Sequence, residues 1–370
     1  MKTKRMQRKI NFNAGPAALP DDVLRQAAEA VREYKGTGLS ILELPHRSAH
    51  FLDIVEESKL LVKKLCALGD DHEVLWLHGG GRQQFCMVPM NFLAQNDSAG
   101  YIDSGHWAEE ALEYATHYGN VQVLASSRQS NYNCLPAWPA PIPKDLSYIH
   151  FTTNNTIFGT QWHKVPKTKS PLIADMSSDI FSRRHDYKKY ALFYAAAQKN
   201  LGVAGVALAV VRKDMLERIV RPLPPMLSYK SQVAENSILN TANVFGVYIS
   251  LLMLRWIDEK GIAAIERDNK RKAQLLYDAI DSSKVFTLHV KIKEHRSLMN
   301  VCFTAKTPRH EKAFITLCEK NNITGIKGHR SVGGFRASLY NCITVAHVQQ
   351  LVGLMKEFEE QNKVVKKQNI

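Results

Sequence analysis

The chain has 370 residues, of which 45% are hydrophobic and 23% are charged. This composition is typical of a globular protein and excludes a chain that is disordered throughout, and the length predicts roughly two domains. The formal net charge of +14 suits nucleic acid, a membrane surface or acidic small molecules as partners, although a basic surface without a specific partner explains the same excess.

Apolar runs of strand length alternate with helical patterns from about residue 20 to about residue 215, which predicts a mostly parallel sheet covered by helices. The clearest runs are 74–77, 171–174, 190–194 and 206–211. The first run ends at a glycine cluster, the second at Asp175, and the third a few residues before Lys199. Because ligands collect at the carboxyl ends of strands in open α/β sheets, we expect these three runs to bring polar groups to one rim.

The pattern becomes helical from Asn243 to about Ser282, with one expected break at Gly261, and this long element leads out of the first domain. The rest of the chain mixes strand-like pieces with helical ones, at 286–290, 299–303, 309–321 and 344–360. That mixture is typical of a smaller α+β domain. We therefore predict one domain over 17–262 and a second over 263–370, with the N-terminal segment 1–16 packed on the second.

The six cysteines lie far apart and lack the paired spacing of metal and redox motifs, so we expect no metal site and reduced thiols, as in a cytoplasmic protein. Clusters of Lys and Arg at 2–9 and 363–367 predict solvated tails, and the start of the chain lacks the apolar stretch of a secretory signal. The longest uncharged-looking segment, Ala191–Val211, contains a central lysine and two glycines, which favours two buried strands around a loop over a membrane span.

Lys199 is the first candidate for chemistry, because lysine is rarely placed in an apolar run without a purpose. Burial lowers the pKa of an amine, and a neutral amine can form a Schiff base with an aldehyde cofactor. The alternative is a lysine with a buried stem whose amine reaches solvent. Asp175 favours the cofactor, since pyridoxal phosphate needs an anion beside its pyridine nitrogen. Taken alone, Asp175 also suits a helix N-cap for Ser177 and Ser178.

The turn Gly79–Gly81, followed by Arg82, lies between a predicted strand and a predicted helix, where backbone N–H groups and the helix dipole favour an anion. It lacks the Gly-Lys-Ser/Thr ending of a nucleotide-binding loop. Trp107 can stack on a cofactor ring, although a core tryptophan is the commoner explanation. Two basic segments, His46–Arg47 and Lys327–Arg336, suit a substrate with anions at both ends, because arginine grips carboxylate or phosphate through two hydrogen bonds. A solvated basic loop is the alternative.

Several stretches match one known family in the same order: Phe12–Ala17, His46–Ser48, Gly79–Arg82 with Gln84–Phe85, Asn155–Ile157, Ala174–Asp179, Ala197–Asn200, Asn240–Thr241 and Lys327–Asn341. From about Ile10 to about Phe358 the chain resembles the phosphoserine aminotransferases, within class V of the pyridoxal-phosphate-dependent aminotransferases. The resemblance implies the α/β architecture of fold type I, with a mostly parallel seven-stranded sheet in a large domain and a smaller α+β C-terminal domain. Pro45, Val203 and Ala242 depart from the family's usual residues.

The resemblance also implies roles for single residues. Lys199 would form the Schiff base, Asp175 would partner the pyridine nitrogen, and the ring would lie against Trp107 with its hydroxyl near Thr156. The phosphate would be held by Gly81, Arg82 and Gln198, together with Asn240 and Thr241 of a neighbouring subunit, so the site would need a homodimer. The substrate's anionic groups would be bound by His46, Arg47, Arg82, His329, Arg330 and Arg336.

The implied reaction transfers an amino group between glutamate and 3-phosphohydroxypyruvate, giving 2-oxoglutarate and phosphoserine for serine biosynthesis. In many bacteria the family also serves pyridoxine (vitamin B6) synthesis, a role on which this sequence is silent. One alternative is another class V activity, such as alanine-glyoxylate or serine-pyruvate aminotransferase, whose substrates lack a second anionic group. A nucleic-acid-binding protein would need aromatic residues interleaved with basic ones or a known binding module, and neither is evident. We therefore expect small anionic substrates, with neither nucleic acid nor a membrane as partner.

Overall fold

The computed structural model describes residues 8–165 and 167–368, with side chains described up to residue 362. Most of the N-terminal tail predicted at 2–9 lies outside the described residues, although Arg8 forms an ion pair with Asp21. The backbone of the predicted C-terminal tail at 363–367 is helical and continues the last helix, Val345–Gln368. Within the described ranges, no helix is long and apolar enough to cross a membrane. The same residues contain no group of three His, Cys, Asp or Glu side chains that could hold a metal ion.

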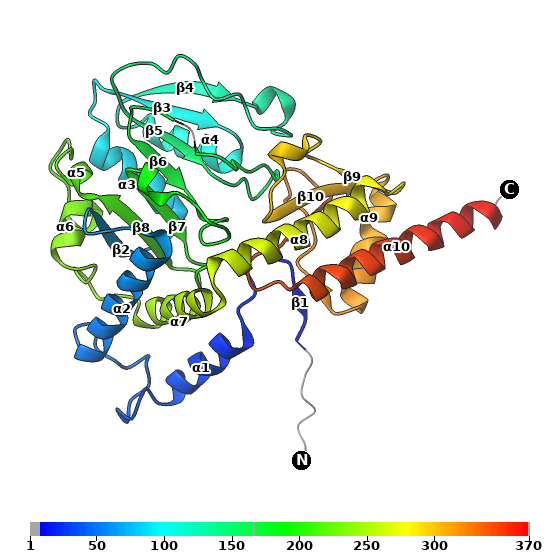
Figure 1. The fold of residues 1–370 in the computed structure, drawn as a ribbon, viewed down its shortest axis with the longest axis horizontal. Helices are drawn as coiled ribbons and strands as arrows, with labels where there is room; N and C mark the ends of the chain where they lie inside the picture. The colour runs from blue at the N-terminus through cyan, green and yellow to red at the C-terminus, as the bar shows by residue number, and fades with distance from the viewer. Residues whose placement is uncertain (1–7, 166, 369–370) are drawn as a thin grey trace.

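A seven-stranded sheet forms the centre of the larger part of the molecule (Figure 1). Its strands are β2 (His72–His78), β3 (Ser98–Asp103), β4 (Asn120–Ser126), β5 (Leu146–Thr152), β6 (Leu172–Asp175), β7 (Leu192–Ala196) and β8 (Val206–Arg212). They lie in the order β2-β8-β7-β6-β5-β3-β4. β8 pairs antiparallel with both β2 and β7, and the other neighbouring strands pair in parallel, so β8 runs opposite to the other six strands. The four predicted runs correspond to β2, β6, β7 and β8. The first three of these share one direction, so they end at the same rim.

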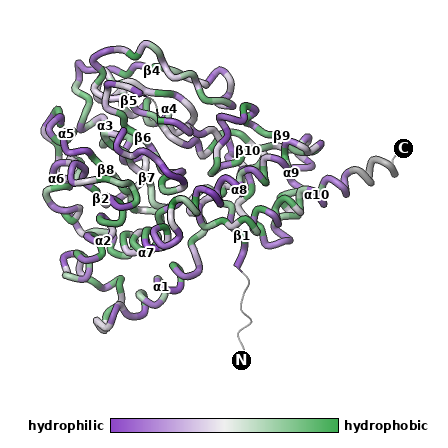
Figure 2. Tube along the Cα trace, in the orientation of Figure 1, coloured by the Kyte–Doolittle hydropathy of each residue, from purple (hydrophilic) through white to green (hydrophobic). Residues whose placement is uncertain are grey.

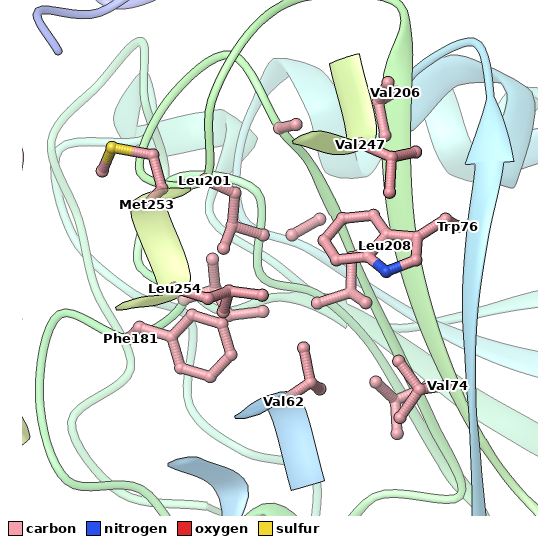
Figure 3. Close-up of a cluster of buried hydrophobic side chains, with 14 of the residues drawn as sticks. Val62, Val74, Trp76, Phe181, Leu201, Val206, Leu208, Val247, Met253 and Leu254 are labelled. Atoms are coloured by element: carbon pink, nitrogen blue, oxygen red, sulfur yellow. The ribbon is translucent and has the colours of Figure 1, made fainter. Parts of the chain in front are cut away.

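Helices cover both faces of this sheet, which explains why its inner strands are apolar on both sides. Side chains of β2 alternate between the faces: Val74 and Trp76 pack in one cluster, while Leu75 and Leu77 pack in another. The first cluster lies under α2 (Ala49–Cys66) and α7 (Val244–Lys260), and Figure 3 shows its side chains between the sheet and these helices. The second cluster lies under α3 (Gly81–Phe92) and α4 (His106–Ala115).

The chain leaves the large sheet through two consecutive helices. The predicted break at Gly261 is confirmed, since Gly261 has a φ of +76° and separates α7 from α8 (Ile262–Asp281). This left-handed conformation costs glycine little and strains other residues. The start of α8 lies beside the domain boundary predicted at 262/263.

A smaller mixed part packs against α8, on the far side of the molecule from β2 (Figure 1). Its elements are β9 (Phe286–Leu288), β10 (Asn300–Ala305), α9 (Pro308–Lys320), β11 (Ile323–Thr324), β12 (Phe335–Ser338) and α10 (Val345–Gln368). β12, β10 and β9 form an antiparallel sheet. The N-terminal strand β1 (Ile10–Asn11) pairs in parallel with β11, and Phe12 joins the apolar core of this part.

The remaining elements are short or peripheral: α1 (Asp21–Arg32), α5 (Lys213–Leu216) and α6 (Tyr229–Ala234), with 3-10 turns η1 (Arg128–Ser130), η2 (Tyr187–Lys189), η3 (Pro225–Leu227) and η4 (Lys293–His295). Figure 2 shows hydrophobic stretches where α7 meets the sheet and more hydrophilic ones along α1 and α8. Burial of apolar surface between α7 and the sheet is the main force that holds this helix on the sheet.

Buried hydrogen bonds join the larger and smaller parts. Asn154, just after β5, donates to Ser178 Oγ and to Asn300 Oδ1, both at 2.8 Å. Asn300 in turn donates to Ser338 Oγ on β12 at 3.0 Å. All four side chains are almost completely buried. Polar groups removed from water in this way are costly to leave unpaired, so this network fixes how the two parts meet.

Candidate active site

A cavity of about 260 Å³ opens at the rim where β2, β6 and β7 end. Its wall is formed by Gly80, Gly81, Arg82, Phe85, Trp107, Asp175, Ser177, Ala196, Gln198 and Lys199. The fold thus brings six of the residues named from the sequence into one wall. Sequence reasoning did not assign Phe85, Ser177 or Ala196 to the site, although the first two lie in the matching stretches.

Lys199 follows β7 and points its amine at the loop after β5. Its Nζ donates a hydrogen bond to Thr156 Oγ1 at 2.9 Å. Burial is the main cause that lowers the pKa of Lys199 to about 8; Asp175 opposes this shift, and the nearby Arg336 contributes to it. Near neutral pH a useful fraction of the amine is therefore unprotonated and able to act as a nucleophile or base.

Asp175 is the last residue of β6 and is 5% exposed. Its Oδ1 accepts a hydrogen bond from the Ser177 N–H at 2.8 Å, which is the local contact expected of a capping aspartate. Among the described residues, only this N–H donates to the carboxylate. Since Asp175 also lines the cavity, it retains the capacity to accept a hydrogen bond from a bound ligand.

The glycine turn between β2 and α3 leads the chain sharply into the helix. Gly79 has a φ of +88°, and a Cβ there would lie 2.1 Å from Gln83 Oε1, so the turn requires glycine at this position. α3 begins at Gly81, so the last glycine of the turn is also the first residue of the helix. The N-terminus of a twelve-residue helix thus lies at the cavity wall, where its dipole and free N–H groups favour an anion.

Arg82 lies between an aromatic ring and a carboxylate. Its guanidinium carbon is 5.1 Å from the centre of the Trp107 ring, and its Nη2 is 3.3 Å from Glu110 Oε2. His106 Nε2 lies 3.7 Å from the same carboxylate. Glu110 raises the pKa of Arg82 through this pairing. Glu110 was missed by sequence reasoning, and its signal was the four-residue spacing from His106 on a helical face.

Arg336, on β12, reaches the site from the smaller part. Its Nη1 lies 3.4 Å from the Thr156 carbonyl oxygen, and its Nε is buried without an acceptor among the described residues. The His329 ring is 6.1 Å from the His106 ring, and burial together with Arg336 lowers the pKa of His329. Arg330 is exposed. The basic segment therefore combines a half-buried arginine at the site with residues that are solvated in this chain.

Eight residues named from the sequence are not part of the cavity wall. Four of them, Thr156, His329, Arg330 and Arg336, are described above, and the other four are His46, Arg47, Asn240 and Thr241. His46 and Arg47 precede α2, and the Arg47 side chain is exposed. Asn240 lines a separate small hollow with Trp76 and His78, and Thr241 beside it is exposed. In a single copy of the chain none of these four residues lines the cavity that Lys199 lines.

The cavity fits a phosphorylated aromatic aldehyde such as pyridoxal phosphate. Trp107 Nε1 and Gln198 Oε1 are buried in the wall and have no hydrogen-bond partner among the residues that the structure describes. Buried polar atoms of this kind usually have a partner, so a ligand is the natural one. The amine of Lys199, the carboxylate of Asp175 and the α3 N-terminus match the aldehyde, the ring nitrogen and the phosphate respectively.

Comparison with known proteins defines the class first: the chain belongs to the class-V aminotransferase family, whose model matches residues 10–351. It is 44% identical to the phosphoserine aminotransferase of Bacillus cereus over 361 residues, which cover 97% of this chain and 100% of that protein. The solved phosphoserine aminotransferase from Bacillus circulans subsp. alkalophilus aligns with a TM-score of 0.93 at 40% identity, over 96% of this chain and 99% of that one. A pyridoxal-phosphate-bound phosphoserine aminotransferase from Trichomonas vaginalis aligns with a TM-score of 0.90 at 34% identity, over 94% and 100%. The predicted family and fold class are confirmed.

Proposed function

We propose that this chain is a pyridoxal-phosphate-dependent phosphoserine aminotransferase, which moves an amino group between glutamate and 3-phosphohydroxypyruvate. The observation that carries the proposal is that Lys199 and Asp175, from neighbouring strand ends, line one cavity beside a helix N-terminus. Full-length similarity to phosphoserine aminotransferases at 44% and 47% identity supports the choice among class V activities.

Residues in and beside the cavity wall would hold the cofactor through different groups. Gly81, Arg82 and Gln198 would hold the phosphate, and Trp107 and Thr156 would contact the ring. Asp175 would keep the ring nitrogen protonated, and the bound cofactor would supply an electron sink for the negative charge that develops on the substrate carbon.

Lys199 performs the proton transfer. With a pKa of about 8, its Nζ can take a proton from the substrate's α-carbon as a base and return it on the other side of the transfer as an acid. The Thr156 hydroxyl accepts a hydrogen bond from Nζ and so orients it. Phe85, Trp107 and Ala196 line the same cavity and limit the access of water to the reacting atoms.

The substrates carry anionic groups at both ends. Arg336 binds one carboxylate, since its Nε is free of protein acceptors in the described structure, and Arg82, His329 and Arg330 assist in binding the substrate's anionic groups. His46 and Arg47 bind the second anionic group, and Asn240 and Thr241 complete the phosphate site. The family resemblance implies that Asn240 and Thr241 come from the second subunit of a homodimer, and His46 and Arg47, which likewise do not line the cavity of one chain, are assigned to the same subunit. The reaction takes place in the cytoplasm, where the described free thiols stay reduced.

An absorbance spectrum recorded before and after addition of glutamate tests the chemistry. The unaltered protein should be yellow, and glutamate should shift its absorbance as the amino group is taken up. Lys199→Ala should abolish both signals, whereas Lys188→Ala, at an exposed lysine, should keep them. Persistence of both signals in Lys199→Ala would rule out the assignment.

Turnover assays test the substrate. Phosphoserine should be used far better than alanine, and a preference for alanine would favour another class V activity. A phosphorylated hydroxythreonine substrate in the same assay tests the additional role in pyridoxine synthesis.

Mixing two inactive variants tests the shared site. In a hybrid of Lys199→Ala and Arg47→Ala subunits, one site regains an intact lysine and an intact partner arginine. An equal, randomly exchanged mixture should therefore recover about a quarter of the sites. No recovery after confirmed subunit exchange would contradict a site built from two chains.

A further inference from the structure

Lys272 is a completely buried lysine on α8 that takes no part in the proposed reaction. Its Nζ donates hydrogen bonds to the carbonyl oxygens of Leu339 at 2.8 Å and Tyr340 at 3.0 Å. Lysine is almost never buried to this extent unless its amine has a specific partner. The two carbonyls are therefore the reason for its position.

The segment that Lys272 holds connects the two sides of the active site. Residues 339–341, here called the 339–341 strap, directly follow β12, the strand that carries Arg336. At the other end of the strap, the Asn341 N–H donates to Asn200 Oδ1 at 3.1 Å. Asn200 is the chain neighbour of Lys199. The strap thus links the substrate-binding arginine to the reactive amine.

α8 contacts the strap through a second side chain as well. Asn269, almost one turn before Lys272, donates to Asn341 Oδ1 at 3.0 Å and to the Ser182 carbonyl oxygen at 2.8 Å. Residues three apart lie on the same face of a helix. One face of α8 therefore holds both ends of the strap.

The Lys272 amine donates to two carbonyl oxygens that have few other hydrogen-bond donors. Among the described residues, the Leu339 carbonyl oxygen accepts a hydrogen bond from Lys272 alone, while the Tyr340 carbonyl also accepts one from the Ile343 N–H at 2.8 Å. Burial lowers the pKa of Lys272 to about 7, an effect that Lys260 increases and that Cys342 and Asp268 reduce. The neutral amine still has two N–H groups, one for each carbonyl. Both protonation states can therefore hold the strap.

We propose that Lys272 is a positioning residue, which fixes Arg336 relative to Lys199 by holding the 339–341 strap; the inference rests on the proposed function. Arg336 Nη1 and Lys199 Nζ both reach Thr156, at 3.4 Å from its carbonyl oxygen and 2.9 Å from its hydroxyl. A shift of the strap therefore changes the distance between the carboxylate-binding group and the amine.

Lys272→Met tests the role, because methionine keeps an apolar unbranched stem and lacks a donor. The KM for glutamate and for phosphoserine should rise about tenfold, while kcat stays within about threefold, because a displaced Arg336 weakens binding throughout the reaction. Lys272→Gln restores two N–H donors and should recover most of the lost affinity. Lys270→Met is the matched control, since Lys270 lies on the same helix, is 61% exposed and pairs with Glu266.

The result that overturns the inference is a Lys272→Met protein with a lowered melting temperature and an unchanged KM, because that pattern belongs to a purely structural lysine. If Lys272→Met does not fold, Asn269→Ala removes the milder contact from the same strap. It should raise the KM about threefold, and an unchanged KM would again overturn the inference. Failure of the proposed function has a different signature, namely no transamination by the unaltered protein or by Lys270→Met.

Discussion

Glu110→Gln tests whether the carboxylate that faces Arg82 competes with the substrate for the guanidinium or holds the guanidinium in its productive position. The Arg82 side chain is 61% exposed and that of Glu110 is 14% exposed, and ion pairs this open to solvent contribute about 0 to 1 kcal/mol. The free energy of unfolding should therefore change by less than about 1 kcal/mol. The guanidinium, however, lies in the cavity wall. Release from its competing carboxylate should lower the KM for phosphoserine by up to about fivefold, the equivalent of 1 kcal/mol.

Steady-state kinetics at low and high salt measure this effect, which should shrink as the salt concentration rises. Glu109→Gln is a matched control on the same helix, because Glu109 pairs with Arg128 instead. The competition model would be refuted by a KM for phosphoserine that rises in Glu110→Gln. That outcome would mean that Glu110 holds Arg82 in its productive position.

Three further predictions concern stability. The pKa of Lys272 is about 7 in the folded chain and near 10 in the unfolded chain. Between these two pH values the unfolded chain binds more protons than the folded chain. The free energy of unfolding should therefore rise by about 2 kcal/mol from pH 7 to pH 9. Urea unfolding should show this rise in the unaltered protein and its loss in Lys272→Met. Gly79→Ala should cost about 1 to 3 kcal/mol in the same assay, and adding Gln83→Ala should recover only part, since the positive φ remains. Asn300→Leu should cost about 2 to 5 kcal/mol by leaving Asn154 and Ser338 short of a partner, and unaltered stability would contradict the importance of that network.

The sequence was sufficient to predict the strands that carry the site. Apolar runs ending at Asp175, at the glycine turn and shortly before Lys199 were visible because buried strands in α/β sheets are continuously hydrophobic. The shared direction of these strands followed from the alternation of strands and helices. Local chemistry and general topology were thus enough to predict that the amine, the carboxylate and the helix N-terminus lie at one rim.

Features that depend on distant pairing could not be predicted in the same way. The antiparallel direction of β8 is invisible in its sequence, because a buried apolar run reads alike in both directions. The contact of Asn154 with Asn300 joins residues far apart in the chain, and each alone resembles a loop or strand-end asparagine. Glu110 looked like any carboxylate on a helix surface, since its partner Arg82 belongs to another helix.

The reversed strand β8 has a consequence for the dimensions of the catalytic centre. It separates β2 from β7, and neighbouring strands are about 4.8 Å apart, so the chain exits that lead to Gly81 and to Lys199 are spaced by about 9.6 Å. β8 therefore sets the distance between the helix N-terminus at Gly81, which favours an anion, and the nucleophilic amine of Lys199. Without this strand β2 and β7 would be direct neighbours, and the length of ligand that can span the two exits would be shorter even with every wall residue retained.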